Sequence, residues 1–138
     1  MFRRVECLLL RLPNLEDGLA FYRDKLGLPL AWIRPGRAAG LRMKDRKTEL
    51  VLLQEHGSPE TDLLVDSVDD ACRAFVEAGG SLVQPPFDLP VGRCGVVRDP
   101  WGNSLVLMDA TRGPLRVDHE HRVIDPAGRE RARPGAAT

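Results

Sequence analysis

Side chains suited to metal or acid–base chemistry are sparse in this sequence of 138 residues. Its three histidines are His56, in the loop-like stretch QEHGSPE, and His119 and His121 near the C-terminal end. A His-x-His pair on a strand would turn both rings to one face and form half of a zinc site. No third ligand lies at a suitable spacing, so we interpret the pair as a surface feature.

The three cysteines, Cys7, Cys72 and Cys94, form no CxxC pair. An odd number of cysteines without such a motif is typical of a reducing compartment, and it predicts a cytoplasmic protein without a disulfide framework. Free cysteines are among the most buried residue types, so we interpret Cys7 as a small buried hydrophobe rather than a nucleophile.

The charges balance, with 20 lysines and arginines against 20 aspartates and glutamates. Nucleic-acid binding needs a clustered basic excess, so the composition predicts no nucleic-acid partner. The first apolar run, residues 7–12, contains Arg11 and is too short and too charged for a signal peptide or a membrane span. A chain of this length forms one domain or two small modules that share a core.

The elements that would position these side chains follow one pattern twice. A strand over 5–12 is followed by Asn14 as a helix N-cap, an amphipathic helix and Gly27 at its end. Ser67 and Asp70 repeat the cap before a second helix that ends at Gly79 and Gly80. The remaining predicted strands are 30–34, 41–44, 49–54, 63–65, 81–85, 95–98 and 104–109.

A shift of 53 positions superposes Asn14 on Ser67, Tyr22 on Phe75 and Gly27 on Gly80. The sequence is therefore an internal repeat of two βαβββ units. One such unit would leave a sheet face bare, so two are expected to join. The last two strands form a hairpin around Asp99–Asn103, where Pro100 and Gly102 suit a tight turn and Asp99 can accept hydrogen bonds from the following backbone.

Three segments resemble one known family. LPNLEDGLAFYRDKLGL (12–28), LLVDSVDDACRAFVEAGG (63–80) and VRDPWGNSLVLMD (97–109) resemble signatures of the vicinal oxygen chelate superfamily, which holds glyoxalase I, bleomycin-resistance proteins and extradiol dioxygenases. The resemblance implies an α+β fold in which two βαβββ modules form an incomplete, strongly curved β-barrel with helices on the outside. It also implies a homodimer.

This comparison divides the chain into a domain of residues 1–110, with modules of about 1–56 and 57–110, and a C-terminal segment of 111–138. Leu115 to Ile124 is predicted as an added strand or arm. Pro126 to Thr138, rich in Arg, Pro, Gly and Ala, is predicted as a flexible tail.

The resemblance also implies four positions for metal ligands, one on the first and one on the last strand of each module. They fall on Cys7, Val51, Glu60 and Val106. Two valines cannot bind a metal, so we predict that neither metal nor another cofactor is bound. Glu49, two residues before Val51, is an alternative donor, and Glu60 is otherwise interpreted as a solvated charge.

Strand alternation turns one set of side chains toward the helices and the other toward the concave side, where an apolar lining with a few polar groups is typical of a small-molecule site. Trp32 and Trp101 are candidate walls or lids, or they pack at the junction of the modules, and Arg11 and Arg93 are candidate contacts for an anion or carbonyl. The predicted ligand-binding residues are Cys7, Leu9, Arg11, Trp32, Val51, Leu53, Glu60, Asp62, Leu64, Arg93, Trp101, Val106 and Met108.

The sequence supports two alternative functions. The first is a metal-independent protein that binds a small, partly apolar molecule, and the two valines favour it. The second is a lyase, isomerase or dioxygenase that uses an unusual metal set or no metal. The sequence assigns no catalytic residue.

Overall fold

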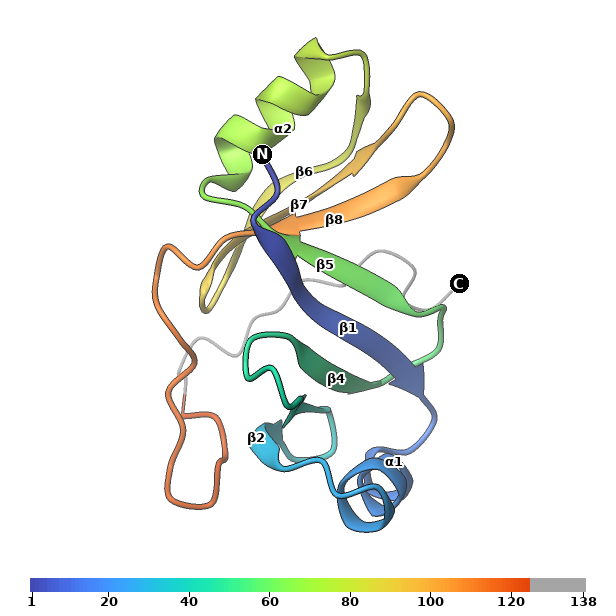
Figure 1. Ribbon diagram of the computed structural model, residues 1–138, viewed down its shortest axis with the longest axis vertical. Helices are drawn as coiled ribbons and strands as arrows, with labels where there is room; N and C mark the ends of the chain where they lie inside the picture. Colours follow the sequence, from blue (N-terminus) through green and yellow to red (C-terminus); the bar gives the residue numbers. More distant parts are fainter. Residues whose placement is uncertain (125–138) are drawn as a thin grey trace. The chain divides into compact units, whose positions relative to one another are not determined.

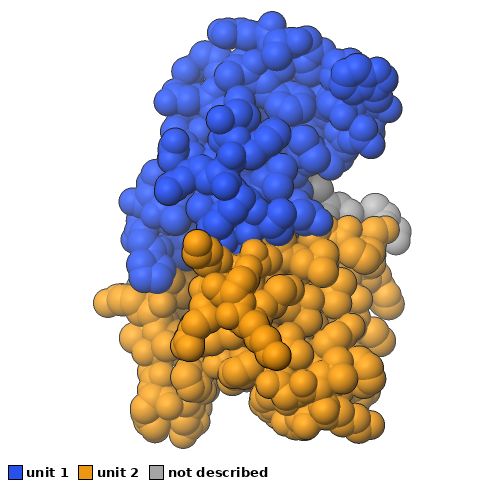
Figure 2. Space-filling model, in the orientation of Figure 1, with its two compact units in different colours: residues 1–6, 61–114, 127–134 blue, residues 7–60, 115–126, 135–138 orange. Residues whose placement is uncertain are grey.

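A computed structural model describes residues 1–124 of the chain. These residues form two compact units, one of residues 1–6 and 61–114 and the other of residues 7–60 and 115–124, coloured separately in Figure 2. The tail predicted for 126–138 lies outside the described residues. No helix within 1–124 is both long and apolar enough to cross a membrane.

The unit of residues 7–60 carries four strands in the order β2-β3-β4-β1. β1 runs parallel to β4, and the other neighbours are antiparallel. One helix follows β1 (Figure 1). It begins as an α-helix and continues with the wider winding of a π-helix. The elements are β1 (Arg4–Leu12), α1 (Leu15–Leu19), η1 (Ala20–Lys25), β2 (Leu30–Arg34), β3 (Ala38–Arg42) and β4 (Glu49–Gln54).

The unit of residues 61–114 repeats this plan with the order β5-β8-β7-β6. β5 runs parallel to β8, and β7 pairs antiparallel with both β8 and β6. A single helix packs against β6, β7 and β8. The elements are β5 (Glu60–Leu64), α2 (Val68–Glu77), β6 (Ser81–Leu89), β7 (Gly92–Arg98) and β8 (Ser104–Met108).

The predicted repeat and the α+β fold class are confirmed. Asn14 and Ser67, 53 positions apart, both cap a helix: the Asn14 side chain accepts a hydrogen bond from the backbone N–H of Asp17, and that of Ser67 from Asp70. Gly27 has φ +81°, the left-handed conformation expected after a helix. Each unit has the element order βαβββ.

Strand alternation divides each sheet into two faces, as predicted. In residues 7–60 the helix-side core contains the inward residues of all four strands, including Leu8, Leu10, Leu41, Leu50 and Leu52, together with Leu15 and Leu19. In residues 61–114 the helix-side core contains Val65, Val68, Ala71, Cys72, Val97 and Leu107. The opposite residues of the same strands form separate clusters on the faces away from the helices.

Six strands differ in their bounds from the predictions: β1, β5 and β7 begin earlier, β5 and β8 end one residue earlier, and β3 and β6 differ most. β3 covers 38–42 rather than 41–44, because Ala38, Ala39 and Gly40 have low strand propensity and pair only in the context of their neighbours β2 and β4. β6 continues through Pro85 and Pro86 to Leu89, with shifts of register on either side of Gln84. Proline is tolerated there because β6 lies at the end of the strand order, where a missing N–H need not pair.

The segment from 115 to 124 adds to the edge of β2. Ile33 donates its backbone N–H to the His121 carbonyl at 2.8 Å, and Val123 donates to the Ile33 carbonyl at 2.9 Å. Val117 and Val123 form a further bridge within the segment. The edge of β2 is thereby paired, which removes an open row of hydrogen-bonding groups.

Candidate ligand-binding face

Six of the predicted ligand-binding residues, Cys7, Leu9, Arg11, Trp32, Val51 and Leu53, lie on one face of the unit of residues 7–60. This helix-free face consists of Cys7, Leu9, Ala38, Val51 and Leu53, with Trp32 packed against them. The strand register arranges it in rows: Leu9 is beside Val51, then Gly40, then Trp32, while Arg11 is beside Leu53, then Ala38, then Arg34.

The apolar members of this face are tightly packed. Leu9 and Leu53 are each only 1% exposed, and Cys7 and Val51 are also buried. In the other unit Leu64 and Met108 are buried as well. On the face of residues 7–60, these apolar residues form a close-packed layer beneath the half-buried side chains.

Trp32 forms a fixed wall on this face. Its indole Nε1 donates a hydrogen bond to Glu49 Oε1 at 2.8 Å, and Glu49 lies beside Cys7 in the register of β1 and β4. The indole covers Gly40 so closely that a Cβ there would overlap it. The absence of a side chain at residue 40 thus allows Trp32 to lie on the sheet, with its polar edge anchored to a carboxylate.

Arg11 and Glu60 meet in a buried ion pair. Arg11 Nη2 donates to Glu60 Oε1 at 2.9 Å, its Nε to Glu55 Oε2 at 3.1 Å and its Nη1 to the Ser58 carbonyl at 2.6 Å. The Arg11 side chain is 1% exposed and that of Glu60 is 6% exposed. Our interpretation of Glu60 as a solvated charge is wrong: a carboxylate this deeply buried needs the guanidinium beside it. Arg11 is a structural cation rather than one open to a ligand.

In the unit of residues 61–114, Val106 and Met108 lie in one apolar cluster with Phe87, Leu89, Cys94 and Val96. Asp62 and Leu64 are their register partners on β5, and Asp62 is fully buried. These four predicted residues are therefore neighbours.

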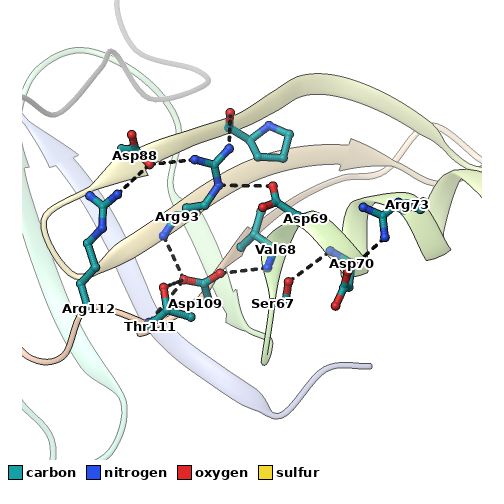
Figure 3. A network of polar contacts seen from close by, with 11 residues as sticks. Ser67, Val68, Asp69, Asp70, Arg73, Asp88, Arg93, Asp109, Thr111 and Arg112 are labelled. Atoms are coloured by element: carbon teal, nitrogen blue, oxygen red, sulfur yellow. Dashed lines mark hydrogen bonds and ion pairs between the residues drawn. The ribbon is translucent and has the colours of Figure 1, made fainter.

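Arg93 lies in a separate polar network (Figure 3). Its guanidinium bonds Asp88 at 2.8 Å, Asp69 at 3.2 Å and the Pro86 carbonyl at 3.2 Å. These contacts within the chain occupy the donors that we predicted for an anion or carbonyl of a ligand.

Asp109, at the end of β8, organises the same network and was predicted only as a strand end. Its carboxylate accepts hydrogen bonds from the backbone N–H groups of Val68 and Arg93, both at 2.9 Å, and from the Thr111 hydroxyl at 2.9 Å (Figure 3). Burial by itself raises the pKa of Asp109, but these hydrogen bonds outweigh it and leave the pKa lowered. The carboxylate thus ties the start of α2 to β7 and β8.

Trp101 is 83% exposed at the tip of the β7–β8 hairpin and belongs to none of the apolar clusters. The turn beneath it is built as predicted. Asp99 Oδ1 accepts hydrogen bonds from the N–H groups of Trp101 and Asn103, both at 2.9 Å, and Gly102 has φ +94°. Hydrogen bonds from the Asn103 side chain and from backbone N–H groups lower the pKa of Asp99. The residues of this hairpin tip thus form a tight turn that leaves the Trp101 side chain exposed.

The four positions implied for a metal do not form a donor set that suits one. Val51 and Val106 have no donor atom, and Glu60 is already bound to Arg11. Within residues 1–124, no three His, Cys, Asp or Glu side chains are grouped closely enough to hold a metal ion. His119 is exposed beside Glu120, and His121 contributes only its carbonyl to β2. Hard divalent cations need several oxygen ligands, so these residues do not fit one.

Arg34 is a residue of this face that the sequence analysis missed. It ends β2 two positions after Trp32, so both side chains lie on the helix-free face. Its Nε and Nη2 atoms are buried and donate no hydrogen bond to residues 1–124. The sequence contains a pattern that predicts this position, because alternation along the predicted strand 30–34 turns Arg34 to the same face as Trp32.

Comparison with known proteins agrees with this architecture. Among solved structures, a methylmalonyl-CoA epimerase from Mycobacterium tuberculosis matches with a TM-score of 0.62 and 17% identity, covering 78% of this chain and 88% of that one. A glyoxalase/bleomycin resistance protein/dioxygenase superfamily member from Vibrio splendidus matches with a TM-score of 0.58 and 16% identity, over 79% and 99%. A Mn(II)-bound glyoxalase from Novosphingobium aromaticivorans gives 0.58 and 19%, over 86% and 43%.

At these identities the structural matches establish the fold alone. No curated protein matches the sequence. The family model described as Glyoxalase/Bleomycin resistance protein/Dioxygenase superfamily matches residues 4–107, which is most of the chain. The chain therefore belongs to the glyoxalase/bleomycin resistance protein/dioxygenase superfamily.

Proposed function

We propose that this protein binds a small, partly apolar organic molecule without using a metal. The observation that carries the proposal is the type of residue found at the positions where the family resemblance implies metal ligands. Val51 and Val106 are buried among apolar side chains, and the charge of Glu60 is neutralised by Arg11. Binding a dication there would require breaking a buried ion pair, and a single carboxylate would not offset the dehydration of Mg²⁺.

The half-buried side chains of the helix-free face support the small-molecule part of the proposal. Trp32 presents a large aromatic surface, held in place by Glu49 and by the close approach to Gly40. Such a rigid aromatic wall over a packed apolar layer, beside a few polar groups, is the usual composition of a small-molecule site.

Tryptophan fluorescence tests this proposal. The sequence has two tryptophans, so a Trp101→Phe variant leaves Trp32 as the reporter. We expect benzyl alcohol, a neutral aromatic probe, to change the Trp32 emission saturably, and we expect the same titration curve with EDTA as with added Mn²⁺. Binding that appears only with Mn²⁺, or no saturable change at all, would contradict the proposal.

An enzyme is the second candidate, and Glu49 is the observation that favours it. It is a half-buried carboxylate on the same face, oriented by Trp32, and a positioned carboxylate is a common general base. Two of the similar structures are, by their names, an epimerase and a glyoxalase. Glu49→Gln distinguishes the candidates: a binding protein keeps its affinity and has no turnover to lose, whereas an enzyme loses turnover while it still binds substrate.

We further propose a cytoplasmic location for this protein. Cys7, Cys72 and Cys94 are all buried and form no disulfide with one another, a state that a reducing compartment maintains. Cell fractionation tests this location, and recovery of the protein outside the cytoplasmic fraction would contradict it.

A further inference from the structure

Arg34 carries a feature that the proposed function does not yet explain. Burying polar N–H groups of a charged side chain without acceptors is unfavourable, and native proteins rarely leave such groups unpaired. Yet the Nε and Nη2 atoms of Arg34 are buried and have no acceptor among residues 1–124.

Arg34 differs from the neighbouring arginines of this face, whose guanidinium groups bind carboxylates within residues 1–124. Arg11 is paired with Glu55 and Glu60, and Arg37 Nη1 lies 3.5 Å from Glu55 Oε1. Glu55 and Glu60 are thus engaged by Arg11 and Arg37, and neither accepts a hydrogen bond from Nε or Nη2 of Arg34.

Other carboxylates near β2 already have partners. In the segment paired to the edge of β2, Asp118 and Glu120 both bind Arg122, at 3.1 and 3.3 Å. Glu49, on the same face, accepts the indole N–H of Trp32. None of these carboxylates bonds Arg34.

The two unpaired atoms define the shape of the missing acceptor. Nε and Nη2 form one edge of the guanidinium, where two parallel N–H groups match the two oxygens of a carboxylate. Trp32, two positions earlier on the same face of β2, lies where an apolar body attached to that carboxylate would extend.

We propose that the Nε/Nη2 edge of Arg34 binds the carboxylate of a small organic acid whose apolar body lies beside Trp32. This rests on the proposed function and specifies its ligand class. It names Arg34, rather than Arg11 or Arg93, as the anion-binding residue.

Titration calorimetry with benzoate, benzyl alcohol and phenyl phosphate tests the assignment. We expect benzoate to bind more tightly than either of the others. Arg34→Met should weaken benzoate binding by about tenfold or more, the effect of losing a charge-assisted hydrogen bond. Arg34→Lys, which keeps the charge but loses the paired N–H edge, should fall in between. Arg37→Met, which removes a neighbouring guanidinium that already has a partner, should leave benzoate affinity unchanged.

Folding provides an independent readout. Since Nε and Nη2 of the Arg34 side chain have no hydrogen-bond partner within residues 1–124, Arg34→Met should not lower the urea midpoint, so lost binding cannot be attributed to unfolding. Unchanged benzoate affinity in Arg34→Met, or tighter binding of phenyl phosphate than of benzoate, would overturn the assignment. If benzyl alcohol binds and benzoate does not, the proposed function stands and the Arg34 assignment fails; if none of the three binds, both fail.

Discussion

At the residue scale, the charged side chains on the strands divide into those that hold the fold and those that are open to a ligand. Strand alternation correctly predicts that Arg11 faces away from the helices. It does not identify the ion-pair partners of Arg11, Glu55 and Glu60, which lie 44 and 49 positions away in the chain. An arginine among inward-facing apolar residues requires a counter-charge. That requirement predicts an acidic partner but not which one, since the pairing depends on how the chain returns to β1.

Arg11→Met tests the structural role of this ion pair. The variant leaves Glu55 and Glu60 without their shared cation, and removal of one partner of a buried ion pair costs about 3–5 kcal/mol. Urea denaturation measures the loss. As a control, Arg23→Met removes an exposed arginine paired only with its neighbour Asp24, and it should change stability by less than about 1 kcal/mol. A similar, small effect of both variants would show that Glu60 is solvated after all.

Asp109→Asn tests the polar network at the end of β8. Both carboxylate oxygens accept a backbone N–H, Oδ2 that of Val68 and Oδ1 that of Arg93, whereas an amide has a single acceptor oxygen. The variant therefore leaves one of these N–H groups unpaired, and we expect a loss of about 1–3 kcal/mol at neutral pH. Because folding lowers the pKa of Asp109 below 3.8, its stabilisation is complete above that value and is lost as the pH falls through the lowered pKa of the folded state. The difference between wild type and variant, measured by urea denaturation, should therefore shrink in acid. A difference that is the same at every pH would contradict this account.

At the element scale, prediction succeeded where local chemistry decides the structure. β2 and β4 have the predicted bounds, 30–34 and 49–54, because their alternating apolar residues end at turn-forming segments. The predicted bounds of β3 were wrong because Ala38–Gly40 are small residues with a weak strand pattern. Tertiary packing explains the smallest of them, since Gly40 fits beneath Trp32. The predicted strand ends at Pro85, whereas β6 continues beyond it. Proline is permitted there because β6 lies at the edge of the sheet, and the local sequence does not reveal an edge position.

The two helix caps offer a matched test of the repeat. Asn14→Ala and Ser67→Ala each remove a side-chain acceptor of a backbone N–H at the N-terminus of a helix. Each should cost about 1 kcal/mol of unfolding free energy. Thermal or urea unfolding of both variants gives the comparison. If one substitution has no effect, the two caps are not equivalent in the way that the 53-residue repeat requires.

At the scale of the whole molecule, we propose a homodimer. The segment after residue 115 pairs with the edge of β2, but β6, at the other end of the strand order, exposes Leu82 and Val83 at 43% and 42%. An apolar edge strand of this kind favours pairing with another chain. Light scattering should show a dimer at roughly tens of micromolar protein, a typical range for weak association, and Val83→Lys should shift it toward monomer. A wild-type monomer at that concentration would contradict the proposal.

Metal analysis tests the central claim most directly. The protein should be purified without chelator, incubated with Mn²⁺ and Zn²⁺, desalted and measured by inductively coupled plasma mass spectrometry, alongside Glu60→Ala. The arrangement of Val51, Val106 and the Arg11–Glu60 ion pair predicts no stoichiometric metal in either protein. One equivalent of a divalent metal in the wild type that disappears in Glu60→Ala would contradict the account and favour a metal-dependent enzyme.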